Sequence, residues 1–89
     1  MTREAFADFL ERLAAGTSSR ADWVEHAVDH YQDEKLEEYR RDCVRLAIQV
    51  GEPFPRTDEH RQHLRKLASE LRAAVQELKK KGSGSNEHN

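Results

Sequence analysis

The sequence predicts an all-α protein, a small four-helix bundle built on a long antiparallel helical hairpin. Three observations support this fold class. Apolar residues recur three and four positions apart in each long segment, which is the spacing of one helix face. Residues that favour helix starts precede these segments, and glycine or proline follows most of them. Hydrophobic and charged residues each make up 36% of the chain, so each helix has only a narrow apolar face.

The first predicted helix covers about residues 3–15. Thr2 occupies the N-cap position, where its hydroxyl can accept a hydrogen bond from a free amide of the first turn. Gly16 ends the helix, because glycine adopts the left-handed conformation of a helix C-terminus without steric cost. The helix should cover the hairpin with four apolar residues: Phe6, Phe9, Leu10 and Leu13.

The second and third predicted helices cover about residues 20–31 and 34–50. Ser19 and Asp33 can cap their first turns. At about 100° per residue, the apolar faces of the two segments differ by roughly 110°, so one straight helix would present two different sides to the core. We therefore expect the chain to break or bend near Gln32.

The third helix carries a seam of apolar residues four and three apart. This seam consists of Leu36, Tyr39, Cys43, Leu46 and Val50. Neighbouring apolar residues widen it toward its C-terminal end, which should therefore be covered on more than one side: Val44, Ala47 and Ile48. Cys43 is the only cysteine, which excludes an internal disulfide and fits a buried thiol in a reducing compartment.

The fourth predicted helix covers about residues 58–81, after a connector that contains Pro53 and Pro55. Phe54, between the two prolines, should plug the end of the bundle, or face a partner if it is exposed. The helix keeps the same apolar spacing to its last turn. Gly82 should end it, so residues 1–81 form a single helical domain and residues 82–89 a disordered tail.

The unequal lengths of the last two helices predict an interaction surface. At 1.5 Å per residue the fourth helix is about 36 Å long and the third about 26 Å, so the fourth must extend past its neighbour. The residues expected to contact a partner, or a second copy of the chain, are Val75, Leu78, Lys79 and Phe54.

Charge is distributed unevenly along the chain, although its formal net value is only −2. Seven lysines and arginines stand against twelve carboxylates up to Pro55, and eight stand against four from Arg56 to Lys81. The two parts can neutralise each other, or the basic helix can meet an acidic partner. A basic face on the last two helices offers weak nucleic-acid or phosphate binding as an alternative function, but carboxylates interleave its arginines, so surface salt bridges are favoured.

Four of the five histidines form two pairs at helical spacing. His26 and His30 are four residues apart on one face, and such a pair can share a divalent metal ion. Asp22, Glu25 or Asp29 could add an oxygen ligand. The stretch lacks the glutamate that follows the first histidine in a zincin helix, so it does not predict a metalloprotease. The competing interpretation is that these histidines lie on a polar face beside carboxylates.

No catalytic grouping and no cofactor motif occurs in the sequence. A segment long and apolar enough for a signal peptide or membrane span is missing as well, which favours a cytoplasmic protein. The leading hypothesis is therefore a non-enzymatic protein–protein interaction module, such as an adaptor, regulator or inhibitor, with homodimerisation as one form of it. Divalent metal binding by the histidine pair is the alternative from a different functional class.

Overall fold

The computed structural model describes the backbone of residues 1–87 and the side chains of residues 1–77. Its elements are α1 (Arg3–Ala15), α2 (Arg20–Trp23), the π-helix η1 (Val24–Val28), α3 (Glu34–Val50) and α4 (Asp58–Glu87). Residues 1–87 contain no strand, so the predicted all-α class is confirmed. None of the helices in this part combines the length and apolar character needed to span a membrane.

α1 begins and ends at the predicted residues. Thr2 Oγ1 accepts a hydrogen bond of 3.0 Å from the backbone N–H of Ala5. Gly16 has a φ of 79°, the left-handed conformation that ends a helix. The four apolar side chains of its face are at most 1% exposed: Phe6, Phe9, Leu10 and Leu13.

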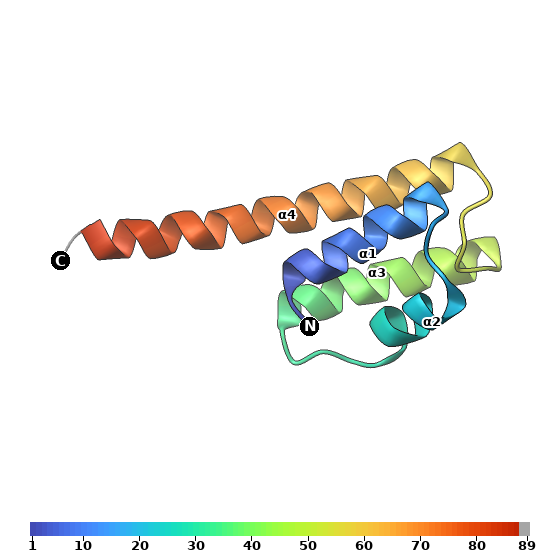
Figure 1. Ribbon diagram of the computed structural model, residues 1–89, viewed down its shortest axis with the longest axis horizontal. Coiled ribbons are helices and arrows are strands. Elements are labelled where there is room, and N and C mark those ends of the chain that lie inside the picture. Colours follow the sequence, from blue (N-terminus) through green and yellow to red (C-terminus); the bar gives the residue numbers. More distant parts are fainter. Residues whose placement is uncertain (88–89) are drawn as a thin grey trace.

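α1 is the central helix of the fold, although the sequence predicts it as a cover. It lies between α3 and α4, and α4 packs mainly along it (Figure 1). α3 and α4 run in opposite directions, as helices joined by a short connector do, but they contact each other less. The physical reason is that α1 has six core residues that are at most 1% exposed, and the same core cluster includes Leu36 and Cys43 of α3 and Leu64 and Leu71 of α4.

The second helix differs from the prediction. The α-helical hydrogen bonding of α2 changes to the wider π pattern of η1, and the helix stops at Asp29, which is extended with φ −89° and ψ 148°. Two side chains account for this end. Tyr31 donates its hydroxyl proton to the carbonyl of His26, and Arg40 Nη1 donates to the carbonyl of Ala27 at 2.9 Å. The predicted break before the next helix is confirmed, and it covers residues 29–33.

α3 has the predicted bounds, but its C-terminal end is less covered than expected. Asp33 Oδ1 accepts from the amides of Lys35 and Leu36 and caps the first turn, and Gly51 ends the helix with a φ of 85°. Of the predicted seam, four residues are buried: Leu36, Tyr39, Cys43 and Leu46. Val50 is 48% exposed and Ile48 is 74% exposed, because α1 and α4 cover a different face of this turn.

α4 begins where predicted and extends further than predicted. Thr57 Oγ1 accepts from the amide of His60 at 3.1 Å. The helix passes Gly82 and continues to Glu87, because a glycine costs only about 1 kcal/mol inside a helix and does not forbid it. Residues 88–89 lie outside the described part. The C-terminal portion of α4 projects beyond the other helices (Figure 1), so the predicted difference in length is present.

Candidate functional site

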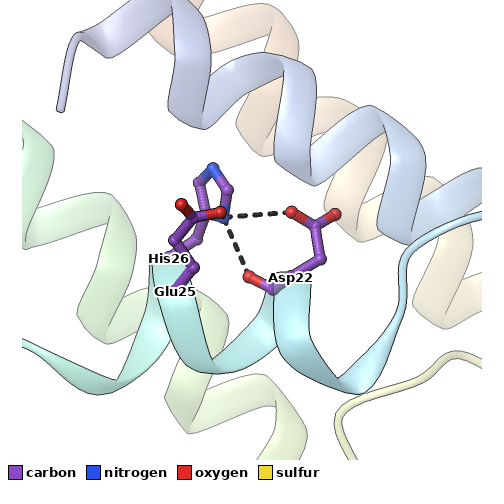
Figure 2. A group of neighbouring side chains, drawn as sticks. All are labelled: Asp22, Glu25 and His26. Atoms are coloured by element: carbon purple, nitrogen blue, oxygen red, sulfur yellow. Dashed lines mark hydrogen bonds and ion pairs between the residues drawn. The ribbon is translucent and has the colours of Figure 1, made fainter.

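The turn from α2 into η1 brings one imidazole and two carboxylates together. Figure 2 shows Asp22, Glu25 and His26 on the same side of this turn. One ligand atom of each residue lies within 4.8 Å of the others, and among residues 1–77 this is the only such group of three or more. His26 Nδ1 lies 3.2 Å from Asp22 Oδ1 and 3.8 Å from Glu25 Oε2, and 2.8 Å from the backbone oxygen of Asp22.

The His26 ring is held in place by α1. It is 6% exposed. The Phe9 ring stacks on it with centroids 4.6 Å apart and an angle of 7° between the planes, and Phe6 lies 6.4 Å away in a tilted arrangement. The apolar face of α1 therefore fixes the ring while Nδ1 points toward the carboxylates.

Asp22 is held by two further side chains. Arg12 Nε donates to Oδ2 and Arg12 Nη2 to Oδ1, each at 3.0 Å. Ser18 donates its hydroxyl proton to Oδ2 at 2.8 Å. The hydrogen bonds from Arg12 are the main reason that the pKa of Asp22 lies below its ordinary value. The carboxylate is therefore ionised at neutral pH, and it links α1 to α2.

The structure places His26 and His30 in different surroundings. His30 Nδ1 lies 2.7 Å from Glu37 Oε2, and its side chain is 79% exposed. The ligand group around His26 contains Asp22 and Glu25, two of the predicted oxygen ligands, and it contains neither His30 nor Asp29.

The other histidine pair lies at the start of α4. His60 is buried, and its pKa is lowered, mainly by burial and also by the neighbouring His63. Neither residue belongs to a group with ligand atoms close enough to share an ion, among the residues whose side chains are described.

A buried ion pair, which the sequence analysis missed, fixes residues 29–33 to α3. Glu37 is 7% exposed and Arg40 6%. Arg40 Nε and Nη2 donate to the two oxygens of Glu37 at 2.7 and 2.8 Å, and the amide of Tyr31 donates to Glu37 Oε1 at 2.9 Å. Arg40 is the main cause of a pKa well below the ordinary value for Glu37. A glutamate and an arginine three residues apart look like a surface pair in sequence, so only the fold shows that they are buried.

An apolar groove lies between α2 and the C-terminal end of α3. Its volume is about 270 Å³, below the range of about 300–1,000 Å³ that is usual for small-molecule sites. The lining residues are Trp23, Val44, Ala47, Ile48, Gly51, Glu52 and Pro53.

The predicted partner residues have different positions. Phe54 is partly buried and packs against the core, in agreement with the role of a plug. Val75 is partly buried on α4. The side chains of Leu78 and Lys79 lie outside the described residues.

The arginines of the predicted basic face are mostly paired with carboxylates of this chain. Arg41 lies 3.3 Å from Glu37, Arg45 lies 3.6 Å from Asp42, and Arg61 lies 3.0 Å from Asp58. Further along α4, Arg72 binds Asp8 and Glu11 of α1. This pattern agrees with internal salt bridges, and it weakens the case for a nucleic-acid surface.

Cys43 is buried, and burial raises the pKa of its thiol to about 12. The thiol is therefore protonated at physiological pH. A protonated, buried thiol is a poor nucleophile and a poor metal ligand.

Comparison of the chain with known protein families, with curated proteins and with solved structures finds no match. Its function is therefore inferred from its own residues.

Proposed function

We propose that this chain is a non-enzymatic helical module that binds protein, and that the groove between α2 and α3 is a contact surface. The observation that carries the proposal is Ile48, which is 74% exposed at the edge of this groove. A large aliphatic side chain beside a hollow lined by Trp23 and Pro53 resembles the knob and pocket of a protein interface. Burying it stabilises a complex by roughly 1.5–3 kcal/mol.

The occupant that we propose is a second copy of the chain. A two-fold axis pairs each surface with itself, so Ile48 of each copy would enter the groove of the other. Arg45 lies three residues before Ile48, and Glu52 lies four residues after it, just beyond the end of α3 at Val50. An antiparallel contact of two copies about Ile48 would bring Arg45 of one copy near Glu52 of the other, and the two side chains would then exchange their partners within the chain, Asp42 and Arg56.

The projecting end of α4 is proposed as a second contact surface. Val75 is partly buried, and the apolar spacing of the sequence continues to Leu78, followed by Lys79. Figure 1 shows the C-terminal part of the α4 ribbon with no other helix beside it. A second helix lying along it would extend the packing that α1 begins.

The cellular setting that we propose is the cytoplasm. The one cysteine is buried and protonated, which suits a reducing compartment. The chain has no second cysteine with which to form an internal disulfide.

Light scattering after size-exclusion chromatography, across a range of protein concentrations, tests the proposal. We expect the wild-type chain to dimerise, and Ile48→Asp to shift it to monomer. Gln49→Asp is the matched control, because it adds the same charge at the adjacent exposed position and should still dimerise. Leu78→Glu tests the α4 surface separately.

Three results would contradict the proposed surfaces. A wild-type chain that stays monomeric at every concentration would exclude the second copy as occupant. If Ile48→Asp and Gln49→Asp both dimerise like the wild type, the groove is not the interface. If Leu78→Glu also leaves the association and the melting temperature unchanged, the α4 surface is excluded.

A further inference from the structure

We infer that Asp22, Glu25 and His26 form a binding site for a divalent transition-metal ion such as Zn²⁺ (Figure 2). His26 Nδ1 faces three oxygen atoms: the backbone oxygen and Oδ1 of Asp22, and Oε2 of Glu25. A single proton on Nδ1 makes a good hydrogen bond to only one or two of them. With the ring proton on Nε2, the Nδ1 lone pair can bind a cation in place of the hydrogen bond to the backbone oxygen of Asp22, and the same cation can take Asp22 Oδ1 and Glu25 Oε2 as ligands.

The distances fit the coordination of zinc. Zinc binds histidine nitrogen and carboxylate oxygen at about 2.0–2.2 Å in a tetrahedron, which places two ligand atoms about 3.3–3.5 Å apart. The distance of 3.2 Å between His26 Nδ1 and Asp22 Oδ1 is close to this separation. Glu25 Oε2, at 3.8 Å, must move by roughly half an ångström, and its side chain is 72% exposed and has room to do so. Water would take the fourth position, as it does in zinc sites with three protein ligands.

The hydrogen bonds of Asp22 leave the required lone pair available. An ionised carboxylate has about four acceptor positions, two on each oxygen. Arg12 and Ser18 take both positions on Oδ2, and Arg12 takes one on Oδ1. The remaining position is on Oδ1, the oxygen that lies beside His26. Arg12 and Ser18 thus orient the ligand in the way that outer hydrogen bonds orient ligands in known metal sites.

The donor atoms and the nearby charge limit which ion binds and how tightly. One imidazole with two carboxylates suits Zn²⁺, Co²⁺ or Ni²⁺ better than a soft ion such as Cu⁺, which prefers sulfur. The positive charge of Arg12, bound to the same carboxylate, opposes a cation. We therefore expect weaker affinity than that of a structural zinc site with cysteine ligands.

This site differs from a simple pair of histidines four residues apart. His30 takes no part in it, because its Nδ1 binds Glu37 on α3. The two arrangements differ in what they require of His30: the pair requires His30, with Glu25 as one of three alternative oxygen ligands, whereas the site inferred here requires Glu25 and not His30.

Calorimetric titration of the full chain with ZnCl₂ decides between them. We expect one ion per chain and at least about tenfold weaker binding for Glu25→Gln, since even outer-shell changes cost about 10–100-fold. His30→Ala is the matched control and should bind like the wild type. Glu25 is exposed, so Glu25→Gln should leave the fold intact, which circular dichroism can verify. His26→Ala is the secondary variant, because it removes a stacked, buried ring.

Three outcomes would overturn the inference. The wild-type chain could release no heat above the buffer control, Glu25→Gln could bind as tightly as the wild type, or His30→Ala could weaken binding as much as Glu25→Gln. None of these outcomes depends on the oligomeric state, so this experiment and the light-scattering experiment can fail independently.

Discussion

The contact between α1 and α4 and the segment from α2 to Asp33 are held together by different interactions. Between α1 and α4 the interior is apolar, with Phe9, Leu10, Leu64 and Leu71 all fully buried. From α2 to Asp33 the chain is held by hydrogen bonds and ion pairs of Asp22, Tyr31 and Glu37. The strength of the apolar contact depends on buried area and volume, so it falls with the number of atoms removed. In the polar segment each hydrogen bond joins two particular groups, so removal of one group leaves the other buried without a hydrogen bond.

A substitution in the apolar contact should have the largest effect. Leu71→Ala removes a fully buried side chain of α4 and leaves a cavity against α1. We expect it to lower the free energy of unfolding by about 2–5 kcal/mol, as measured by urea denaturation. Gln76→Ala, at an exposed position of the same helix, is the control and should change it by no more than about 0.5 kcal/mol. Equal effects of the two would show that α4 does not pack as described.

A substitution in the polar segment should have a smaller, local effect. Arg40→Ala leaves the buried carboxylate of Glu37 without its main partner and the carbonyl of Ala27 without its donor. We expect faster hydrogen exchange at the amide of Tyr31 and a change in the fluorescence of Trp23, the only tryptophan. Arg45→Ala is the control, since the side chain of Arg45 is 69% exposed. If Arg45→Ala disturbs these probes as strongly, the ion pair is not what holds this segment.

Acid below about pH 4 should loosen the polar segment before the apolar contact. The pKa values of Asp22, Asp33 and Glu37 are all lowered in the folded chain by hydrogen bonds from arginines. These groups therefore add stability above the pKa of the unfolded chain, about 4, and this stability is lost as the pH falls below that value. We expect Trp23 fluorescence to change at higher pH than the helical circular dichroism. Coincident transitions would mean that the two regions unfold as one unit.

The sequence predicts the apolar part of the fold well. The bounds of α1 and α3 and the start of α4 follow from Thr2, Asp33, Thr57 and the two glycines with positive φ, because capping and helix termination are local effects. The burial of one face of α1 follows from the three- and four-residue spacing of its apolar residues, which is also a local property of the sequence. The central position of this helix could not be predicted, since helical periodicity shows which side is buried and not which helix covers it.

The polar site was only partly predictable. The sequence suggests His26 as a ligand and Asp22 and Glu25 among its oxygen donors, because all three lie within one helical turn or so. It also suggests His30, which would lie on the same face of a continuous α-helix. The helix ends at Val28, however, so His30 follows a different path and binds Glu37. The end of the helix at Val28 depends on Arg40 and Tyr31, which donate hydrogen bonds to its carbonyl groups from outside the helix. The sequence of the helix itself does not indicate either hydrogen bond.

The partnership of α1 with α4 also sets an order for folding. Arg72 binds Asp8 and Glu11, which are 64 and 61 residues away along the chain, whereas the ion pair of Arg40 and Glu37 spans only three. Closing the longer loop costs more entropy, so contacts of short separation form first. During synthesis the face of α1 that packs on α4 therefore stays uncovered until α4 has emerged. A nascent chain released before Leu71 would expose this face to chaperones and to other unfinished chains.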